Sequence, residues 1–463
     1  MNRRIKISLI LIFVLLFFLG CPGAIFYSRG YRFDFETRKI VKTGGFSFRT
    51  SPKSCEIYLN GKLKKKTDFL LGESFIKNLI PKKYDVNIKK AGYFPWEKTL
   101  EIREGFVTEA KNIILFPKNL NFSTLSSEVE DYFFSPDGKK MIVKKINEEK
   151  WTLDIFDLER NSQEHLLEKA ELSSKRIQLN NLSWSFDSRR ILLETEIEGE
   201  TKYFVIDNLE ENRRQVFSLN YGSIQKVAFS SIDSQEILFL RRLNGTRNLF
   251  QADFSNQKLP NEILKNLISY KINEGDIFWL SHDGFLNRSN FSGQKIETLN
   301  EIPFSLKEGS EYEIEVLDWV IFLKEDGSLY QLNQSSGAFE KITDSTTNLK
   351  LSQDSKKLVI ANNYEIWILF LEEINEQPRR QNGQKIFLTR FSQKIGEIFW
   401  LGNNYLIFDA GNKIKIAEVD DRDRINIIEL SDFEDPKIAW SQELETIYLL
   451  SDKTLYYYNN LLP

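Results

Sequence analysis

The sequence predicts an all-β protein with one N-terminal transmembrane helix, and three observations support this prediction. A strand–turn–strand pattern first seen at residues 134–143 recurs to the end of the chain. Residues 46–117 contain short alternating segments and no stretch of helical period. Residues 7–27 carry no charge and are mostly Leu, Ile, Phe or Val. Because 463 residues are too many for one ordinary core, we expect at least two domains.

The repeat begins as Phe-Ser-Pro-Asp-Gly-Lys-Lys-Met-Ile-Val at residues 134–143, where an Asp-Gly turn joins two apolar runs. Asp-Gly and Asp-Ser tolerate the tight backbone of a hairpin turn, and β-branched and aromatic residues favour buried strands. Further copies occupy residues 184–193, 229–239, 277–286, 319–330, 351–360, 399–408 and 440–449. A period of about 35 to 50 residues is typical of solenoids, arrays and propeller blades.

Most copies are followed by a third strand-like segment, and several units end in a fourth, weaker one. Four antiparallel strands in each repeated unit predict a β-propeller. We count eight blades, with seven as the alternative because the units near residues 279 and 319 are closest to merging. The last unit has three strands and ends at residues 456–458. Residues 120–125 could supply its missing outer strand and close the ring.

The repeat resembles the WD40-like repeat of TolB-type propellers. The match covers the Ser-Pro-Asp-Gly-Lys-Lys-apolar-apolar-Val pattern, at residues 134–143, 184–193 and 351–360. Elsewhere in residues 118–463 the pattern is followed in outline. The resemblance implies a WD40-like propeller that acts as a platform for binding.

Residues 46–117 predict a compact antiparallel β-sandwich, which a polar and aromatic connector at residues 29–45 joins to the apolar segment. One strand ends in Asn60-Gly61, the strongest short hairpin signal. The strand-like segments are residues 46–50, 55–59, 74–79, 84–89, 98–102 and 108–115. Lys62, Lys64, Lys65 and Lys66 follow this hairpin, and we interpret them as a solvated hairpin tip rather than a contact for anionic polymer or lipid.

This segment resembles the PEGA domain. The resemblance rests on Pro52, on Ile-Tyr-Leu-Asn-Gly at residues 57–61, on Leu-Ile-Pro-Lys-Lys-Tyr-Asp-Val at residues 79–86 and on Gly92-Tyr93. The chain departs from the family pattern at Lys82, where glycine is usual. The resemblance implies an extracytoplasmic adhesion or spacer module without an assigned chemistry.

The N-terminus predicts an uncleaved membrane anchor. About 20 apolar residues cross a bilayer as a helix, and basic residues before them (Arg3, Arg4 and Lys6) stay in the cytoplasm. The alternatives are a cleaved signal peptide and a lipoprotein signal, in which Phe-Leu-Gly-Cys at residues 18–21 loosely resembles a lipobox; Pro22 disfavours both. All three place the chain after Ser28 outside the cytoplasm. Cys21 and Cys55 give no disulfide framework, and we expect Cys21 to be a buried apolar residue of the helix.

The composition argues against several classes of site. A net charge of −3 with intermixed signs does not suit nucleic-acid binding. There is no P-loop, dinucleotide fingerprint or Gly-x-Ser-x-Gly elbow. The two histidines, His165 and His282, have no second ligand at metal-binding spacing, and we interpret His282 as a turn residue. We therefore predict no catalytic, cofactor or metal site and no enzymatic activity.

Three recurring or clustered groups have both a functional and a structural interpretation. The turn aspartates are better explained by turn geometry than by catalysis: Asp137, Asp187, Asp233, Asp283, Asp326 and Asp354. One acidic cluster could bind calcium but lacks the EF-hand spacing, so we expect a solvated loop: Glu418, Asp420, Asp421 and Asp423. Four tryptophans before turns on presumed inner strands are expected to pack between blades rather than to stack on sugars: Trp184, Trp279, Trp400 and Trp440.

The sequence therefore predicts a single-pass membrane protein of the bacterial cell envelope that binds or scaffolds. Its expected parts are residues 1–28, 29–45, 46–117 and 118–463. Residues 7–27 meet the bilayer, and the propeller meets an envelope protein or polysaccharide. A hydrolase or lyase acting on envelope polysaccharide is the alternative, and a spacer without a ligand is a third possibility. Carboxylates lining a propeller mouth would favour the enzyme, whereas a hydrophobic and neutral lining would favour binding.

Overall fold

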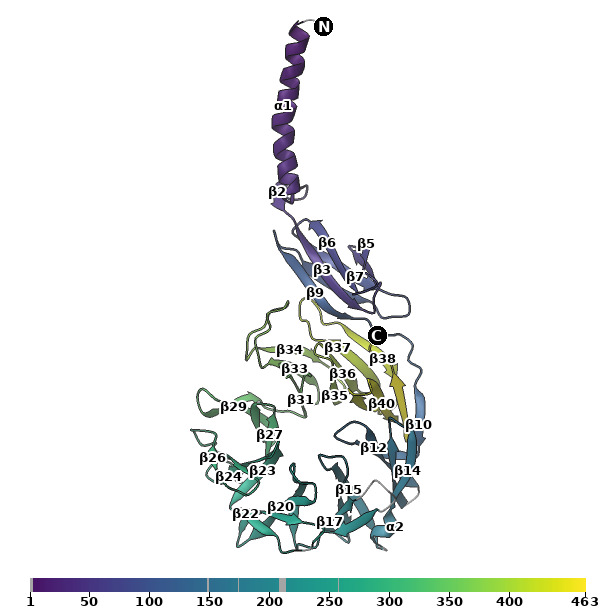
Figure 1. Cartoon of the computed structure of the whole chain (residues 1–463), viewed down its shortest axis with the longest axis vertical. Coiled ribbons are helices and arrows are strands. Elements are labelled where there is room, and N and C mark those ends of the chain that lie inside the picture. The colour runs from purple at the N-terminus through teal and green to yellow at the C-terminus, as the bar shows by residue number, and fades with distance from the viewer. Residues whose placement is uncertain (1–2, 148–149, 174, 208–213, 257) are drawn as a thin grey trace.

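The computed structural model describes residues 3–147, 150–173, 175–207, 214–256 and 258–463. A long helix, a small β-sandwich and a β-propeller follow one another along the longest axis of the molecule (Figure 1). The all-β prediction is confirmed for the body of the chain. In the described residues only α1 (Arg3–Ser28) and the one-turn α2 (Lys169–Leu172) are helical.

Helix α1 stands away from the rest of the protein. Its segment Ile10–Ser28 has a mean hydropathy of 2.5 over its best window, and none of that window is buried. The helix is therefore long and apolar enough to span a membrane, and a signal sequence would have the same properties. Cys21 is half-buried rather than buried, and neither Cys21 nor Cys55 forms a disulfide.

The connector contains a small hairpin that the sequence did not predict. Strand β1 (Tyr31–Asp34) pairs with β2 (Lys39–Lys42), and the Thr43 N–H closes the hairpin by donating to the Gly30 carbonyl at 2.8 Å. The Asp34 carboxylate accepts bonds from the Glu36 N–H and the Thr37 hydroxyl in the turn. Two residues thus separate the hairpin from the end of α1.

The small domain is a sandwich of two sheets around one core. Phe46, Phe48, Ile57 and Ile88 of the facing sheets are completely buried in that core. One sheet has the order β6-β3-β9, from β3 (Gly44–Ser51), β6 (Glu73–Leu79) and β9 (Val107–Ile114). The other has the order β5-β4-β7-β8, from β4 (Glu56–Leu59), β5 (Lys62–Lys66), β7 (Lys83–Lys89) and β8 (Trp96–Glu101).

Two details of the sandwich differ from prediction. β3 and β9 are parallel, so the sandwich is not purely antiparallel. The chain returns through the second sheet before it reaches β9, which allows β9 to lie beside β3 in the same direction. The lysines after Asn60-Gly61 form the exposed edge strand β5 rather than a turn tip. A run of lysines blunts such an edge against pairing with other chains.

Residues 123–459 form eight four-stranded antiparallel sheets, numbered here in chain order from β11. Sheet 1 has β11 (Val129–Phe134), β12 (Lys140–Asn147), β13 (Lys150–Asp157) and β14 (Ser162–Glu168); sheet 2 has β15 (Ile177–Trp184), β16 (Ile191–Ile197), β17 (Glu200–Asp207) and β18 (Gln215–Ser218); sheet 3 has β19 (Ile224–Phe229), β20 (Glu236–Leu243), β21 (Thr246–Asp253) and β22 (Asn261–Leu264); sheet 4 has β23 (Leu267–Asn273), β24 (Asp276–Ser281), β25 (Leu286–Asn290) and β26 (Glu297–Thr298).

The other four sheets follow the same order. Sheet 5 has β27 (Tyr312–Leu317), β28 (Val320–Glu325), β29 (Ser328–Asn333) and β30 (Ala338–Thr343); sheet 6 has β31 (Asn348–Leu351), β32 (Lys357–Ala361), β33 (Glu365–Phe370) and β34 (Lys385–Arg390); sheet 7 has β35 (Ile395–Leu401), β36 (Tyr405–Ala410), β37 (Lys413–Glu418) and β38 (Ile427–Asp432); sheet 8 has β39 (Lys437–Ser441), β40 (Thr446–Ser451), β41 (Thr454–Asn459) and β10 (Ser123–Ser127).

Sheet 8 joins the two ends of this region. β10 comes from the N-terminal side and pairs antiparallel with β41 as the outer strand. The prediction that a segment near residues 120–125 completes the last sheet is confirmed, with the strand starting three residues later than expected. Pairing between distant parts of the chain removes the exposed edge that three strands would leave.

Side chains on successive residues of a central strand bury against two different neighbouring sheets. On β32, Leu358 and Ile360 pack towards sheet 5, whereas Val359 and Ala361 pack towards sheet 7. Strand geometry points alternate residues to opposite faces, and both faces are covered, so these strands are apolar throughout. Eight such clusters join sheet 1 to 2, 2 to 3, 3 to 4, 4 to 5, 5 to 6, 6 to 7, 7 to 8 and 8 back to 1. The sheets therefore close into a ring.

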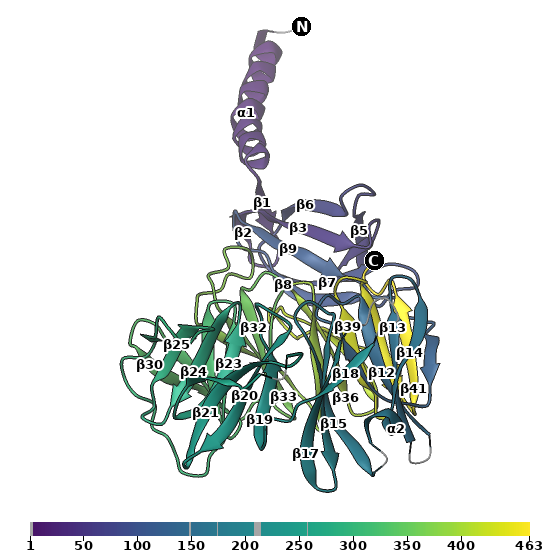
Figure 2. The same cartoon turned by 60° about the horizontal axis from the view of Figure 1, so that its bottom comes forward.

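The ring has two different faces. Because neighbouring strands are antiparallel, turns between first and second and between third and fourth strands lie on one face, and the remaining turns and links lie on the other. The small domain contacts the turns after β33 and β37, on the first of these faces. We name it the proximal face, and the opposite one the distal face. Figure 2 shows the sandwich at one end of the propeller and α2, a link between sheets, at the other.

Candidate functional site: a charged hollow on the distal face

A hollow of about 1260 Å³ opens on the distal face of the propeller. Its walls come from sheets 2 to 5: the β16–β17 hairpin, the link before β19, the β20–β21 hairpin and the link before β27. We name it the distal hollow. It lies away from the small domain and from α1, where a partner can reach it.

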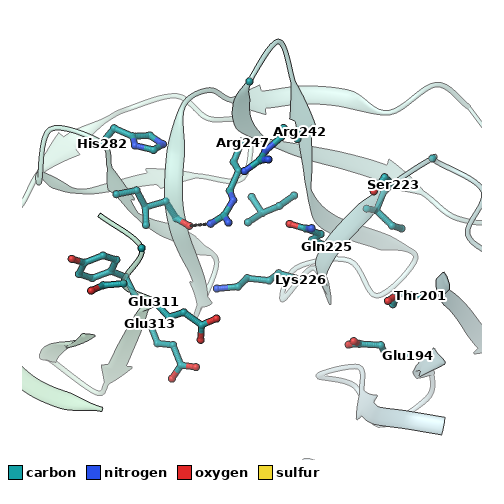
Figure 3. Close-up of a pocket in the computed structure, with 18 of the residues that line it drawn as sticks. Glu194, Thr201, Ser223, Gln225, Lys226, Arg242, Arg247, His282, Glu311 and Glu313 are labelled. Atoms are coloured by element: carbon teal, nitrogen blue, oxygen red, sulfur yellow. Dashed lines mark hydrogen bonds between the residues drawn. The ribbon is translucent and has the colours of Figure 1, made fainter. Parts of the chain in front are cut away.

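Sheet 3 supplies a basic group to the distal hollow. Lys226 lies on β19 at a β-bulge, where one extra residue separates the pairs formed by Gln225 and Ala228. Lys226 has a φ of 47°, a left-handed backbone that re-aims its side chain. Arg242 and Arg247 flank the β20–β21 turn, and the Arg247 guanidinium donates to the Ile268 carbonyl at 3.4 Å (Figure 3).

Carboxylates lie on both sides of this basic group. Figure 3 shows the Lys226 side chain extending towards Glu311 and Glu313, which sheet 5 and its preceding link supply. Glu194 of β16 lies on the other side, and burial raises the pKa of its carboxyl group. The distal hollow therefore presents alternating signs of charge across three sheets.

Several of these charges have no partner among the residues that the structure describes. Among the described residues, no hydrogen bond or ion pair engages the side chains of Lys226, Arg242 or Glu311. Other lining charges are paired, as in the contact of Lys202 with Glu200 at 2.7 Å and of Lys307 with Glu325 at 2.6 Å. The free charges suit a polar partner that carries both positive and negative groups. We expected a mouth lined either by carboxylates or by hydrophobic and neutral groups. The distal hollow is instead lined by side chains of both positive and negative charge.

His282 also lines the distal hollow, in the turn between β24 and β25. The structure confirms it as a turn residue and corrects the alignment of the repeat. The copies at residues 277–286 and 319–330 span the second and third strands of their sheets, whereas the others span the first and second. Asp283 and Asp326 therefore lie on the distal face, not on the proximal face with Asp137.

The turn aspartates stabilise their own turns by hydrogen bonds. The Ser135 hydroxyl donates to Asp137 at 2.6 Å, and Ser352 donates to Asp354 at the same distance. Ser281 and Asp283 make the same contact although their turn lies one strand later. The same local bond therefore stabilises hairpins of both kinds.

The tryptophans pack between sheets, as predicted, with one correction. Trp184 and Trp400 lie on first strands, and their indole N–H groups donate to Phe133 O at 3.2 Å and Lys350 O at 2.9 Å in the preceding sheet. Trp440 also lies on a first strand, within the cluster that joins sheets 7 and 8. Trp279 lies on the second strand of sheet 4, because the repeat is shifted there.

The acidic cluster lies at the contact between the two domains and is not a solvated loop. Glu418 and Asp420 are buried against the small domain, and Asp423 accepts the Thr99 N–H at 2.7 Å. Asp421 pairs with Arg380 of the neighbouring turn. In the residues described, no group of three His, Cys, Asp or Glu side chains could hold a metal. The turn after β37, which carries this cluster, therefore joins the propeller to the small domain.

The remaining candidates, His165 and the lysines of β5, make contacts with other residues of the protein. His165 lies on β14 with Nδ1 at 3.3 Å from Asp154, which also pairs with Lys145 at 2.8 Å. The edge-strand lysines are exposed, and Lys66 pairs with Glu56 at 2.9 Å. Sequence reasoning missed Lys226, Arg242 and Glu194, since no local motif marks them and only ring closure brings them together.

Comparisons with known proteins add little beyond this geometry. No protein-family model and no curated protein matches the chain. Among solved structures, Saccharomyces cerevisiae Sqt1 is 11% identical with a TM-score of 0.47, over 74% of this chain and 98% of that one. The Myceliophteria thermophila Cps50 (Swd1) β-propeller domain is 14% identical with a TM-score of 0.41, over 74% and 99%. A prolyl endopeptidase is 10% identical with a TM-score of 0.43, and the chain spans 55% of its length. The fold assignment rests on the strand pairing described above.

Proposed function

We propose that this chain is a membrane-anchored, extracytoplasmic binding protein of the bacterial cell envelope. In this proposal α1 spans the membrane, the PEGA-like sandwich spaces the propeller from it, and an eight-bladed WD40-like or TolB-like propeller presents the distal hollow. The observation that carries the proposal is the place of that hollow, on the face opposite the small domain. A binding site there points away from the anchor.

The lining of the distal hollow favours a protein partner over a polysaccharide. Sugar sites commonly offer an exposed aromatic face, but the aromatic residues of this lining, Tyr203 and Tyr312, are 5% and 4% exposed. Unpaired charges of both signs, in contrast, match the mixed charges of a protein surface. A polysaccharide is the alternative partner that the experiment below distinguishes.

Site-specific photo-cross-linking in cells tests the binding proposal. A photoreactive residue at Gln225, inside the distal hollow, should give a discrete adduct, whereas one at exposed Arg189 on the proximal face should not. The charge reversals Lys226→Glu and Arg242→Glu should abolish the adduct. A glycosidase should shorten a polysaccharide adduct and leave a protein adduct unchanged. Absence of any adduct at position 225, or equal adducts at both positions, would contradict the proposal.

The orientation of the anchor requires its own test. Three basic residues precede the apolar segment, but five follow it within residues 29–42. Counting both flanks favours the reverse orientation. We keep the N-terminus in the cytoplasm because an early apolar segment behind a short basic stretch has the form of an export signal. A phosphatase that folds only outside the cytoplasm should be active when it is fused after Pro463. An intact but inactive fusion would show that the chain after α1 lies in the cytoplasm.

A hydrolase or lyase acting on envelope polysaccharide remains the second candidate. The carboxylates of the distal hollow favour it, and the raised pKa of Glu194 suits a general acid. Incubation of the purified protein with envelope polysaccharides measures new chain ends. Cleavage that is lost in Glu194→Gln would establish this activity, and its absence from the wild-type protein would exclude these substrates.

A further inference from the structure

Large apolar side chains are exposed around the foot of helix α1. Phe35 is 83% exposed, and its neighbours Phe33 and Ile40 on the β1–β2 hairpin are 47% and 63% exposed. Phe106 is 69% exposed in the loop between β8 and β9. The Phe106 carbonyl accepts the Gly45 N–H at 3.1 Å, which holds this loop beside the end of the hairpin. Four exposed apolar side chains at one end of a small domain are unusual on a surface that meets only water.

Basic residues surround these side chains. Arg38 ends the exposed turn of the hairpin, and Lys39 and Lys42 begin and end β2. Arg29 precedes the hairpin. Among the described residues, no hydrogen bond, ion pair or ring contact engages the side chains of Arg29, Arg38 or Lys39. The acidic groups nearby are already engaged: Asp34 in the hairpin turn, Glu36 with Lys82 at 2.8 Å and Glu104 with the Lys42 N–H at 2.7 Å.

In a membrane spanned by α1, the hairpin would lie at the depth where the bilayer meets water. The 19 residues of Ile10–Ser28 extend for about 28 Å at 1.5 Å per residue, close to the thickness of a hydrocarbon core. The hairpin begins three residues after Ser28, so it would reach the headgroup layer of a membrane spanned by α1. Its exposed aromatic side chains suit the boundary with the acyl chains, and its free cations suit anionic headgroups.

We propose that the β1–β2 hairpin, with Phe106, binds the surface of the bilayer through anionic lipid headgroups. This inference rests on the proposed membrane anchor but not on its orientation, because either surface of a bacterial membrane offers such lipids. Contact at a second point beside α1 limits the tilt of the sandwich. Since the sandwich is fixed to the propeller, the hairpin then sets the direction in which the distal hollow faces.

Depth-dependent fluorescence quenching of the full-length protein in vesicles tests the proposal. Three variants carry one added tryptophan: Phe35→Trp in the hairpin, Phe17→Trp in α1, and Phe69→Trp as the control. Phe69 is 74% exposed in the loop after β5, near the other end of β3. The vesicles contain phosphatidylglycerol and phosphatidylcholine, and the phosphatidylcholine is brominated either near the headgroup or deep in the acyl chains. The emission of the unmodified protein, which has eight tryptophans, is subtracted.

The added fluorescence of Phe35→Trp should be quenched several-fold more than that of Phe69→Trp, and Phe17→Trp should be quenched by deeper bromines. The double variant Arg38→Glu and Lys39→Glu should weaken quenching at position 35 in these vesicles, but not in vesicles of phosphatidylcholine alone. Quenching at position 17 without quenching at 35 would overturn the inference and leave the anchor intact. No quenching at either position would overturn both. Equal quenching at 35 with and without the charge reversals would overturn the role of anionic headgroups.

Discussion

The Lys98 ammonium lies 3.4 Å from the Glu418 carboxylate at the contact between the sandwich and the propeller, with side-chain exposures of 0% and 6%. Lys98 also donates to the Asp420 and Arg424 carbonyls at 2.7 and 2.9 Å. The Trp96 indole donates to Glu418 at 2.9 Å. Every contact crosses between the domains, so the buried pair joins them into one unit.

Removal of one partner should be costly. Lys98→Met leaves the Glu418 carboxylate buried without its cation, and loss of one member of such a pair costs about 3–5 kcal/mol. It should also raise the pKa of Glu418 further, because burial already raises it and Lys98 opposes that effect. Urea unfolding of the purified protein measures the loss.

The control for this prediction is Lys66→Met, which breaks the exposed pair of Lys66 with Glu56. Exposed pairs contribute about 0–1 kcal/mol. Replacement of both partners, as in Lys98→Met with Glu418→Leu, should recover part of the loss, since no unpaired charge then remains. Equal destabilisation by Lys98→Met and Lys66→Met would contradict the importance of the buried pair.

The sequence predicted the hairpins because their signals are local. Ser135 and Asp137 lie two residues apart and bond to each other, so the turn is encoded in one short stretch. The same short stretch does not determine which two strands of a sheet the hairpin joins. Ser281 and Asp283 make the same bond between a second and a third strand, and the repeat was therefore misaligned in sheets 4 and 5.

The contacts between distant residues could not be predicted in this way. Lys98 lies on the same face of β8 as the buried Trp96 and Leu100, and its partners there belong to the docked propeller. The cluster around Glu418 was interpreted as solvated because its partners lie in another domain. Likewise, Lys226 and Glu194 come from different sheets and Glu311 from the link before β27, and closure of the ring alone brings them to one hollow.

Asp409 should make stability depend on pH. Burial raises the pKa of Asp409 to about 6, although its Oδ1 accepts the Glu397 N–H at 2.9 Å in the β35 bulge. The folded protein therefore binds the proton more tightly than the unfolded chain does. Stability contributed by this group is present below the unfolded pKa and is lost as pH rises towards about 6.

The Asp409→Asn variant isolates this effect. At about 1.4 kcal/mol per pKa unit, the wild type should lose about 2 kcal/mol relative to Asp409→Asn between pH 4 and pH 7. Urea unfolding of both proteins across this range gives the difference. A difference that stays constant with pH, or one that grows in the opposite direction, would contradict a raised pKa at this position.

Two glycines in equivalent turns should differ in their tolerance of alanine. Gly284 and Gly327 have φ values of +85° and +87°, so alanine is strained at both by about 1–2 kcal/mol. At Gly284 a Cβ would also lie 2.2 Å from the Phe304 carbonyl oxygen, whereas no atom lies within 4 Å at Gly327. Gly284→Ala should therefore lose about 1–3 kcal/mol more in thermal or urea unfolding. Similar losses of stability for both variants would contradict this prediction, because the backbone at Phe304 would then move away at little cost.

The indole bonds between sheets should contribute measurably to the ring. Trp400→Phe removes the donor to the Lys350 carbonyl, which is left without this partner between sheets 6 and 7, at a cost of about 1–3 kcal/mol. Trp319→Phe is the matched control, because Trp319 is 44% exposed in the β27–β28 turn and should change stability by less than about 0.5 kcal/mol. Urea midpoints compare the two. Both variants lose the same ring volume, but only Trp400→Phe loses a hydrogen bond that joins neighbouring sheets. If Trp319→Phe destabilised the protein as much as Trp400→Phe, the inter-sheet bond would not be the cause of the loss.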